Sequence, residues 1–319
     1  MALAVAAVLA AETALVAVNT GQAFALADQP KSATRAAKPK TATTAADIPS
    51  ARVAARLSGH RVEALSERSE TSTTWVNKNG TLTTELAAAP VRFQRTGQWT
   101  DVDVTLRGTK HGAESAAHPL GLQLGGKAAG TSSPLVTVGS DQKVALGWQG
   151  TLPKPKLSGA KALFVDVSQG TDISVTATRT GFEQSMVIKE RPQSADFSYT
   201  LPLDVSGLNA KQLPDGSLLF TAEKSQRWAV MSAPVMVDAA VDPVSGEPAR
   251  RVPVAMKLAG KGKSARLVFR PDAKMLVDRD TKFPVTVSTA FSAQAQPAEA
   301  VAQRGVSGNR SAGLDTRSR

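Results

Sequence analysis

Four aspartates have the spacing that best suits chemistry by paired carboxylates. Asp101 and Asp103 stand two positions apart in an alternating run, so a strand would place both on one face. Asp166 and Asp172 belong to a second alternating stretch. Two carboxyl groups about 5 to 10 Å apart across a cleft can hydrolyse a glycosidic bond, and neighbouring carboxylates can bind a cation. Because no third ligand stands beside Asp101 and Asp103, we favour a solvated strand face for this pair.

Other reactive residue types are scarce. Cysteine is absent from the sequence, which excludes disulfides, thiol nucleophiles and thiolate metal sites. The three histidines, His60, His111 and His118, show no spacing that a helix could use to hold a metal. We interpret them as ordinary loop histidines. We therefore predict no catalytic, cofactor-binding or metal-binding residues, no cofactor, and a protein that is not an enzyme.

The charge is strongly basic, with a formal net charge of +11 and an isoelectric point of about 10. This balance is typical of affinity for nucleic acid or for an anionic surface. The excess is spread along the whole chain, and we find no basic stripe in it. We therefore favour the anionic polymers of a cell envelope and expect no specific nucleic-acid partner. The four tryptophans read as core or hairpin packing residues: Trp75, Trp99, Trp148 and Trp228.

The clearest structural pattern is a β-hairpin in residues 165–189. Two runs alternate between apolar and polar residues, and Arg179, Thr180 and Gly181 form the turn between them. One face of this hairpin belongs in a core. Its residues are Ile173, Val175, Phe182, Met186 and Ile188.

Further alternating runs, separated by turn residues, follow at short intervals along the chain. They predict an all-β fold, an antiparallel β-sandwich, either as one body or as two packed sandwich subdomains with disordered termini. Residues 61–291 should be predominantly strand, with less than a fifth in helix. A short helix is also predicted over residues 48–57, with Ser50 as its N-cap.

The composition changes along the chain and suggests five segments. The first is apolar and ends in Ala-x-Ala sites, typical of a secretory signal peptide. The segment after it is rich in Ala, Thr, Lys and Pro, and the last segment is polar without pattern. The predicted organisation is a signal peptide at 1–27, a linker at 28–60, a first β subdomain at 61–150, a second β-sandwich subdomain at 151–291, and a disordered tail at 292–319.

An ordered set of short blocks covers residues 61–287. They include Glu67-Arg-Ser-Glu-Thr-Ser-Thr-Thr-Trp75, Gly97-Gln-Trp-Thr-Asp-Val-Asp103, Ala145-Leu-Gly-Trp-Gln-Gly-Thr-Leu-Pro153, Thr180-Gly-Phe-Glu183 and Phe283-Pro-Val-Thr-Val287. In order and spacing this set resembles the N-terminal β-rich module of secreted or wall-associated bacterial proteins, in particular actinobacterial ones, that carry DNRLRE, LamG-like or YD/Rhs-repeat domains. The resemblance implies an exported, all-β, non-catalytic region without catalytic residues to carry over.

The last block departs from that family. Ser288 and Thr289 stand where the family continues with Asp-Pro and a further β-domain, so we expect a truncated or frameshifted product. The strand at residues 283–287 would then lack its cover and form an exposed edge. From this we expect weak self-association through that edge.

The combined hypothesis is a non-catalytic scaffold or adhesion-type module, secreted and associated with the cell surface or cell wall. Its expected partners are a cell-envelope glycan or a surface protein, through carbohydrate binding, with no membrane span after signal removal. The alternative is a secreted glycan-active hydrolase that uses pairs from Asp101, Asp103, Asp166 and Asp172.

Overall fold

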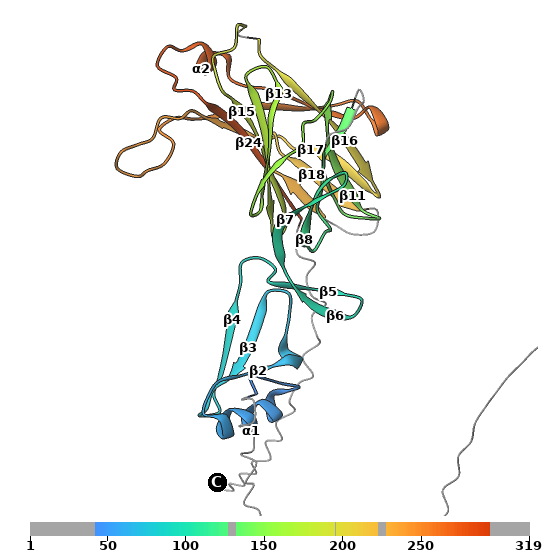
Figure 1. The fold of residues 1–319 in the computed structure, drawn as a ribbon, viewed down its shortest axis with the longest axis vertical. Helices are drawn as coiled ribbons and strands as arrows, with labels where there is room; N and C mark the ends of the chain where they lie inside the picture. The colour runs from blue at the N-terminus through green and yellow to red at the C-terminus, as the bar shows by residue number, and fades with distance from the viewer. Residues whose placement is uncertain (1–41, 127–131, 195, 223–227, 294–319) are drawn as a thin grey trace, which may run out of the picture. The chain divides into compact units, whose positions relative to one another are not determined.

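The computed structural model describes residues 42–126, 132–194, 196–222 and 228–293 (Figure 1). The expected signal peptide, residues 28–41 of the expected linker and nearly all of the tail lie outside these residues. In the described parts of the chain no helix is long and apolar enough to cross a membrane. Strands account for 53% of the described residues and helices for 9%, which confirms the predicted all-β class and the scarcity of helix.

The first described unit is a small sheet covered by one helix. Its sheet has the order β1-β2-β3-β4, with β1 parallel to β2 and the other pairs antiparallel. The bounds are β1 Thr44–Ala45, α1 Ile48–Ser58, β2 Val62–Ala64, η1 Leu65–Glu67, β3 Ser72–Val76 and β4 Leu82–Leu86. The hairpin of β5 Arg92–Arg95 and β6 Gln98–Asp101 follows.

Helix α1 confirms the short helix predicted inside the linker segment, but its cap is different. The Asp47 carboxylate, not Ser50, is the N-cap, and it accepts a hydrogen bond of 2.8 Å from the Ser50 amide. Ala51 and Ala55 are fully buried in a small core that includes Val76. Alanine at these positions lets the helix approach the sheet closely.

The rest of the described chain forms a sandwich of two large sheets. The first has the order β22-β23-β16-β11-β10-β9-β8-β7, and the second has the order β12-β13-β14-β15-β24-β19-β18-β17, with β20 and β21 attached at β24. In chain order the strands of the first half are β7 Asp103–Thr109, β8 Gly112–Ala117, β9 Gln123–Gly125, β10 Ser132–Val138, β11 Lys143–Gln149, β12 Lys156–Ser158, β13 Lys161–Ser168, β14 Thr171–Thr178 and β15 Gly181–Ile188. The second half contains β16 Tyr199–Ser206, β17 Leu208–Gln212, β18 Leu218–Ala222, β19 Ala229–Met231, β20 Val235–Val237, β21 Arg251–Pro253, β22 Ala255–Ala259, η2 Gly262–Ser264, β23 Arg266–Arg270, α2 Ala273–Val277 and β24 Val285–Ala293.

The predicted hairpin is the β14–β15 pair, and it lies at the centre of the second sheet. Its predicted core face is confirmed: Ile173, Val175, Phe182, Met186 and Ile188 are all at most 2% exposed. Strand β24 pairs with the whole length of β15, so segments far apart in sequence lie side by side (Figure 1). The Phe182 and Phe291 rings stack at 5.2 Å across this pairing.

Both lateral edges of the sandwich are bridged from one sheet to the other. On one side the Leu106 amide of β7 donates to the Gly159 carbonyl at the β12–β13 turn, at 2.8 Å. On the other side the Gln212 side chain at the end of β17 meets the backbone of β22. Its amide nitrogen donates to the Met256 carbonyl, and its oxygen accepts from the Leu258 amide at 3.1 Å. The Gln212 side chain thus takes the place of a neighbouring strand.

Two features of the chain's expected organisation differ from the structure. The predicted subdomain boundary near residue 150 falls inside the sandwich, since one core runs from Leu106 to Phe291. The separate core is the small one around α1. The predicted open edge at residues 283–287 is also wrong, because Thr286 pairs with Val187 on one side and with Val237 on the other. The expected self-association therefore loses its basis.

The central pairing makes a prediction for stability. Replacing the fully buried Phe182 by Ala removes the ring that stacks on Phe291, and should lower the free energy of unfolding by about 3 to 5 kcal/mol. Urea denaturation measures the change. Val244→Ala is the control, because Val244 is 95% exposed and its loss should cost less than about 0.5 kcal/mol. Equal small effects for both variants would contradict the assigned core.

Candidate nucleic-acid interface

Asp101 and Asp103 do not form the carboxylate pair that their spacing suggested. Asp101 ends β6, where it lies opposite Arg92 in the strand register, whereas Asp103 begins β7 in the sandwich. The Asp103 carboxylate accepts a hydrogen bond of 2.9 Å from the Thr105 amide and lies 3.8 Å from the Arg107 guanidinium. The bonds to Thr105 hold the pKa of Asp103 below its usual range. Asp103 therefore has a local structural role in its strand.

Asp166 and Asp172 do come together, but around a lysine. The Lys189 ammonium lies 2.9 Å from the Asp172 carboxylate and also contacts Asp166. The Asp166 amide donates to the Asp172 carboxylate at 2.8 Å. Hydrogen bonds to Asp166 and then to Asp172 raise the pKa of Lys189. Lys189 thus bridges the two carboxylates, and both are engaged in an internal ion pair. In the described residues no group of three acidic or histidine side chains could hold a metal ion.

His118 is not the ordinary loop histidine that the sequence suggested. It is 1% exposed, and its Nδ1 accepts a hydrogen bond of 3.0 Å from the Leu120 amide. The proton therefore lies on Nε2, which donates to the Thr178 carbonyl at 2.8 Å, with the Gly181 carbonyl at 3.2 Å. Burial lowers the pKa of His118. The neutral imidazole fastens the loop after β8 to the β14–β15 turn, from one sheet to the other.

The tryptophans follow the packing interpretation only in part. Trp148 and Trp228 are buried in the sandwich core, and the Trp228 ring lies 5.9 Å from Phe291. Trp75 and Trp99 are half-buried in the small unit. The Arg61 guanidinium covers the Trp75 ring at 4.3 Å.

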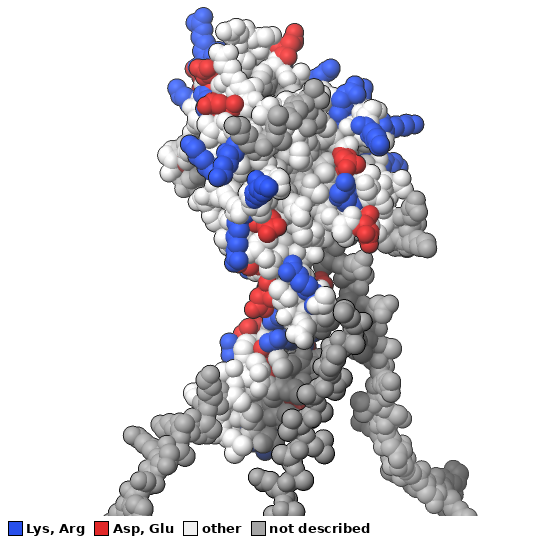
Figure 2. Space-filling view, turned by 45° about the vertical axis from the view of Figure 1, so that its right-hand side comes forward, with Lys and Arg blue, Asp and Glu red and all other residues white. Residues whose placement is uncertain are grey.

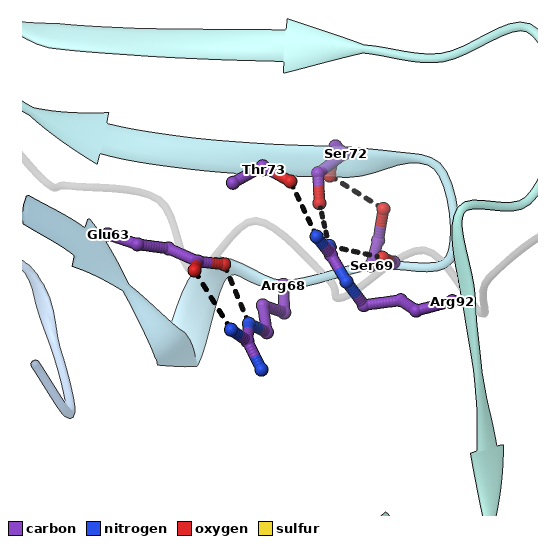
Figure 3. A network of polar contacts seen from close by, with 6 residues as sticks. All are labelled: Glu63, Arg68, Ser69, Ser72, Thr73 and Arg92. Atoms are coloured by element: carbon purple, nitrogen blue, oxygen red, sulfur yellow. Dashed lines mark hydrogen bonds and ion pairs between the residues drawn. The ribbon is translucent and has the colours of Figure 1, made fainter. Parts of the chain in front are cut away.

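Most of the polar side chains of the small unit serve its structure, as Figure 3 shows for one network. Glu63 binds Arg68 through two hydrogen bonds of 2.6 and 2.9 Å, and this contact lowers the pKa of Glu63. The buried Arg92 donates to the Ser69 and Ser72 carbonyls and to the Thr73 hydroxyl. Both oxygens of the Glu63 carboxylate and both terminal nitrogens of Arg92 are therefore engaged within the unit.

A run of basic residues that sequence inspection missed is concentrated on one sheet edge. Residues 250–270 contain seven Lys and Arg and no Asp or Glu. Five of these side chains are exposed on β22, β23 and the turn between them, and we call them the cationic face: Lys257, Lys261, Lys263, Arg266 and Arg270. None of the five forms an ion pair with any residue that the structure describes. Figure 2 shows lysine and arginine side chains over the upper part of the view, with Asp and Glu side chains among them.

The strand register explains why these cations share a surface. Leu267 and Phe269 of β23 point into the core, so Arg266 and Arg270 point outward. Opposite them on β22 are Ala259 and Ala255, and Lys257 lies between these two alanines. Outward positions on the adjoining strand β16 include Thr200 and Pro202. The carboxylate on that strand, Asp204, is already paired with Lys143 at 2.8 Å. The cationic face therefore rises from a floor of small side chains.

A hollow of about 430 Å³ opens at the end of this face. Arg270, at the end of β23, contributes to its lining together with the half-buried Phe197. Asp196 and Ser198 supply polar groups at its rim. The hollow thus combines a cation, an aromatic ring and hydrogen-bonding side chains.

Comparison with known proteins adds a different kind of evidence. No protein-family model matches the chain, and no solved structure matches it. It is 25% identical over 158 residues to the tRNA(Glu)-specific nuclease WapA of Bacillus subtilis subsp. natto (strain BEST195), across 50% of this chain and 7% of that protein. The tRNA3(Ser)-specific nuclease WapA of Bacillus spizizenii matches to the same extent. The tRNA nuclease WapA of Bacillus subtilis (strain 168) is 25% identical over 150 residues, 47% of this chain and 6% of its own length. The chain thus spans less than a tenth of the curated relatives it matches.

These relatives overturn the function expected from the sequence. All three are named as nucleases for tRNA. The expectations of a non-catalytic scaffold or adhesion module, of a protein that is not an enzyme, and of carbohydrate binding at a cell wall are therefore wrong. So are the glycan-active hydrolase and the absence of a nucleic-acid partner. The expected absence of a basic stripe is also wrong, because strand pairing gathers the exposed cations of residues 257–270 on one surface.

His118 makes stability depend on pH. Its folded-state pKa lies below the unfolded value of about 6.5, so only the unfolded chain gains a proton near that pH. The contribution of His118 to the free energy of unfolding should be fully present above about pH 6.5 and should decrease as the pH drops below this value. Urea denaturation between about pH 5 and 7.5 measures this loss. His118→Gln should flatten the profile, whereas the exposed His111→Gln should leave it unchanged. A profile that His118→Gln does not alter would contradict the buried neutral imidazole.

Proposed function

We propose that this chain is a β-rich region of an exported tRNA nuclease of the WapA kind and takes part in that protein's action on tRNA. The observation that carries the proposal is the 25% identity over 158 residues with relatives named for tRNA nuclease activity. Because the match covers 7% of the relative, the activity of the whole relative is proposed here only as the setting in which this chain works.

Two features of the chain support the proposal. The cationic face provides exposed positive charge that no carboxylate in the described parts of the chain neutralises, and proteins bind nucleic-acid phosphates through such charge. The apolar residues 1–27 and their Ala-x-Ala sites support export, and the absence of cysteine means that the exported chain folds without disulfide formation. The resemblance to N-terminal modules of secreted bacterial proteins agrees with export as well.

Direct tRNA binding by the full chain tests the proposal. Fluorescence anisotropy with labelled tRNA should show binding at about 50 mM salt, and the affinity should fall linearly in a log–log plot as salt rises. A tRNA-sized single-stranded DNA serves as the control nucleic acid. Denaturing gels of the same mixtures report whether tRNA is also cleaved. No detectable binding to tRNA at low salt would contradict the proposal.

A further inference from the structure

We infer that the cationic face and the adjoining hollow form one RNA-binding surface, which takes an unpaired segment of RNA. The phosphates would lie along β22 and β23, and one base would enter the hollow beside Phe197. This inference rests on the proposed function for its choice of RNA, and on the arrangement of residues for the place and mode of binding.

Charge and spacing support the phosphate part. Arg266 and Arg270 point outward four residues apart on β23, about 13 Å along the strand. Lys257 lies on the neighbouring strand between them, opposite Val268. Lys261 and Lys263 extend the cationic face into the turn after β22. Because none of these cations pairs with a described carboxylate, phosphates can bind them without displacing an acidic partner.

The shape of the surface also supports the binding of phosphates along β22 and β23. The floor between the cations consists of Ala255, Ala259, Val268, Thr200 and Pro202, whose short side chains leave the sheet surface low. An extended polymer can therefore lie close to the sheet, with lysine and arginine side chains reaching up to it. Residues with long apolar or acidic side chains at these positions would hold the polymer away.

The hollow distinguishes RNA from other polyanions. Arg270 belongs both to the cationic face and to the lining of the hollow, so a phosphate bound at Arg270 would carry its base toward Phe197. Unpaired bases stack on aromatic rings in many RNA-binding surfaces, whereas bases in a duplex are not free to do so. The side chains of Asp196 and Ser198 at the rim can hydrogen-bond to a base edge or to a 2′-hydroxyl. A polymer without bases would gain nothing from Phe197.

The charge part is tested in the full chain with a labelled oligouridylate of about 12 nucleotides. The triple variant Lys257→Gln, Lys263→Gln, Arg266→Gln should lower its affinity tenfold or more at about 0.1 M salt, and reduce the salt slope by about 2. The matched control is Lys110→Gln, Lys156→Gln, Lys161→Gln, which removes the same charge at exposed positions elsewhere in the sandwich. The control should change the affinity less than twofold.

The base part uses a second ligand. Phe197→Leu keeps an apolar side chain but removes the ring, and should lower oligouridylate affinity roughly fivefold. Inorganic polyphosphate, which has no bases, should bind Phe197→Leu as it binds the unchanged chain. Unfolding midpoints within about 2 °C of the parent show that each variant retains the fold.

The outcomes separate this inference from the proposed function. Equal losses in the two triple variants, with tRNA binding intact in the unchanged chain, would overturn the cationic face but leave the proposed function standing. If Phe197→Leu changes the affinities for oligouridylate and polyphosphate equally, or changes neither, the base site is overturned. The surface would then bind polyanions in general. No tRNA binding by the unchanged chain would refute the proposed function itself.

Discussion

The pairing of β15 with β24 is the contact on which the sandwich depends. Eight residue pairs join Gly181–Ile188 to Val285–Ser292, strands about a hundred residues apart in the chain. Gly181 has no side chain at this junction, where a Cβ would lie 2.3 Å from the Phe291 carbonyl oxygen. The Phe291 ring in turn contacts Phe182, Phe220 and Trp228. Because β19 and β20 pair with the other side of β24, the second sheet is divided in two if β24 is absent.

The candidate surface depends on this core although it lies on the first sheet. Met256, Leu267 and Phe269 point from β22 and β23 into the same core, and so fix the outward direction of the neighbouring cations. Tyr199 stacks on Phe269 at 4.7 Å, which anchors β16 beside them. The side chain of Gln212 caps the outer edge of β22 with hydrogen bonds to its backbone. Lys257, Arg266 and Arg270 therefore stand on strands held from both sides, which lowers the conformational entropy lost when a polyanion binds.

Local patterns in the sequence predicted local structure well. The β14–β15 hairpin and its core face were visible because alternation and the turn are contained in about twenty residues. Partners from distant segments were not visible. The carbonyls that bind His118 come from Thr178 and Gly181, and the strands on both sides of residues 283–287 come from β15 and β20. Nothing within 283–287 marks it as a central strand. The cationic face could have been predicted, because residues 250–270 contain no Asp or Glu and because Arg266 and Arg270 fall on the same side of strand β23. The net charge of the whole chain does not reveal this local concentration. No local sequence pattern indicates an action on tRNA, and that proposal rests on the relatives named as tRNA nucleases.

Native-state hydrogen exchange of the full chain tests the central claim most directly. If the β15–β24 ladder holds the sandwich together, the central amides of both strands should exchange only through global unfolding. Their free energies of exchange should then agree, within about 1 kcal/mol, with the global free energy of unfolding from urea denaturation. Central β24 amides that exchange through local opening, several kcal/mol below the β15 amides, would contradict the claim and show that the sandwich persists without its last strand.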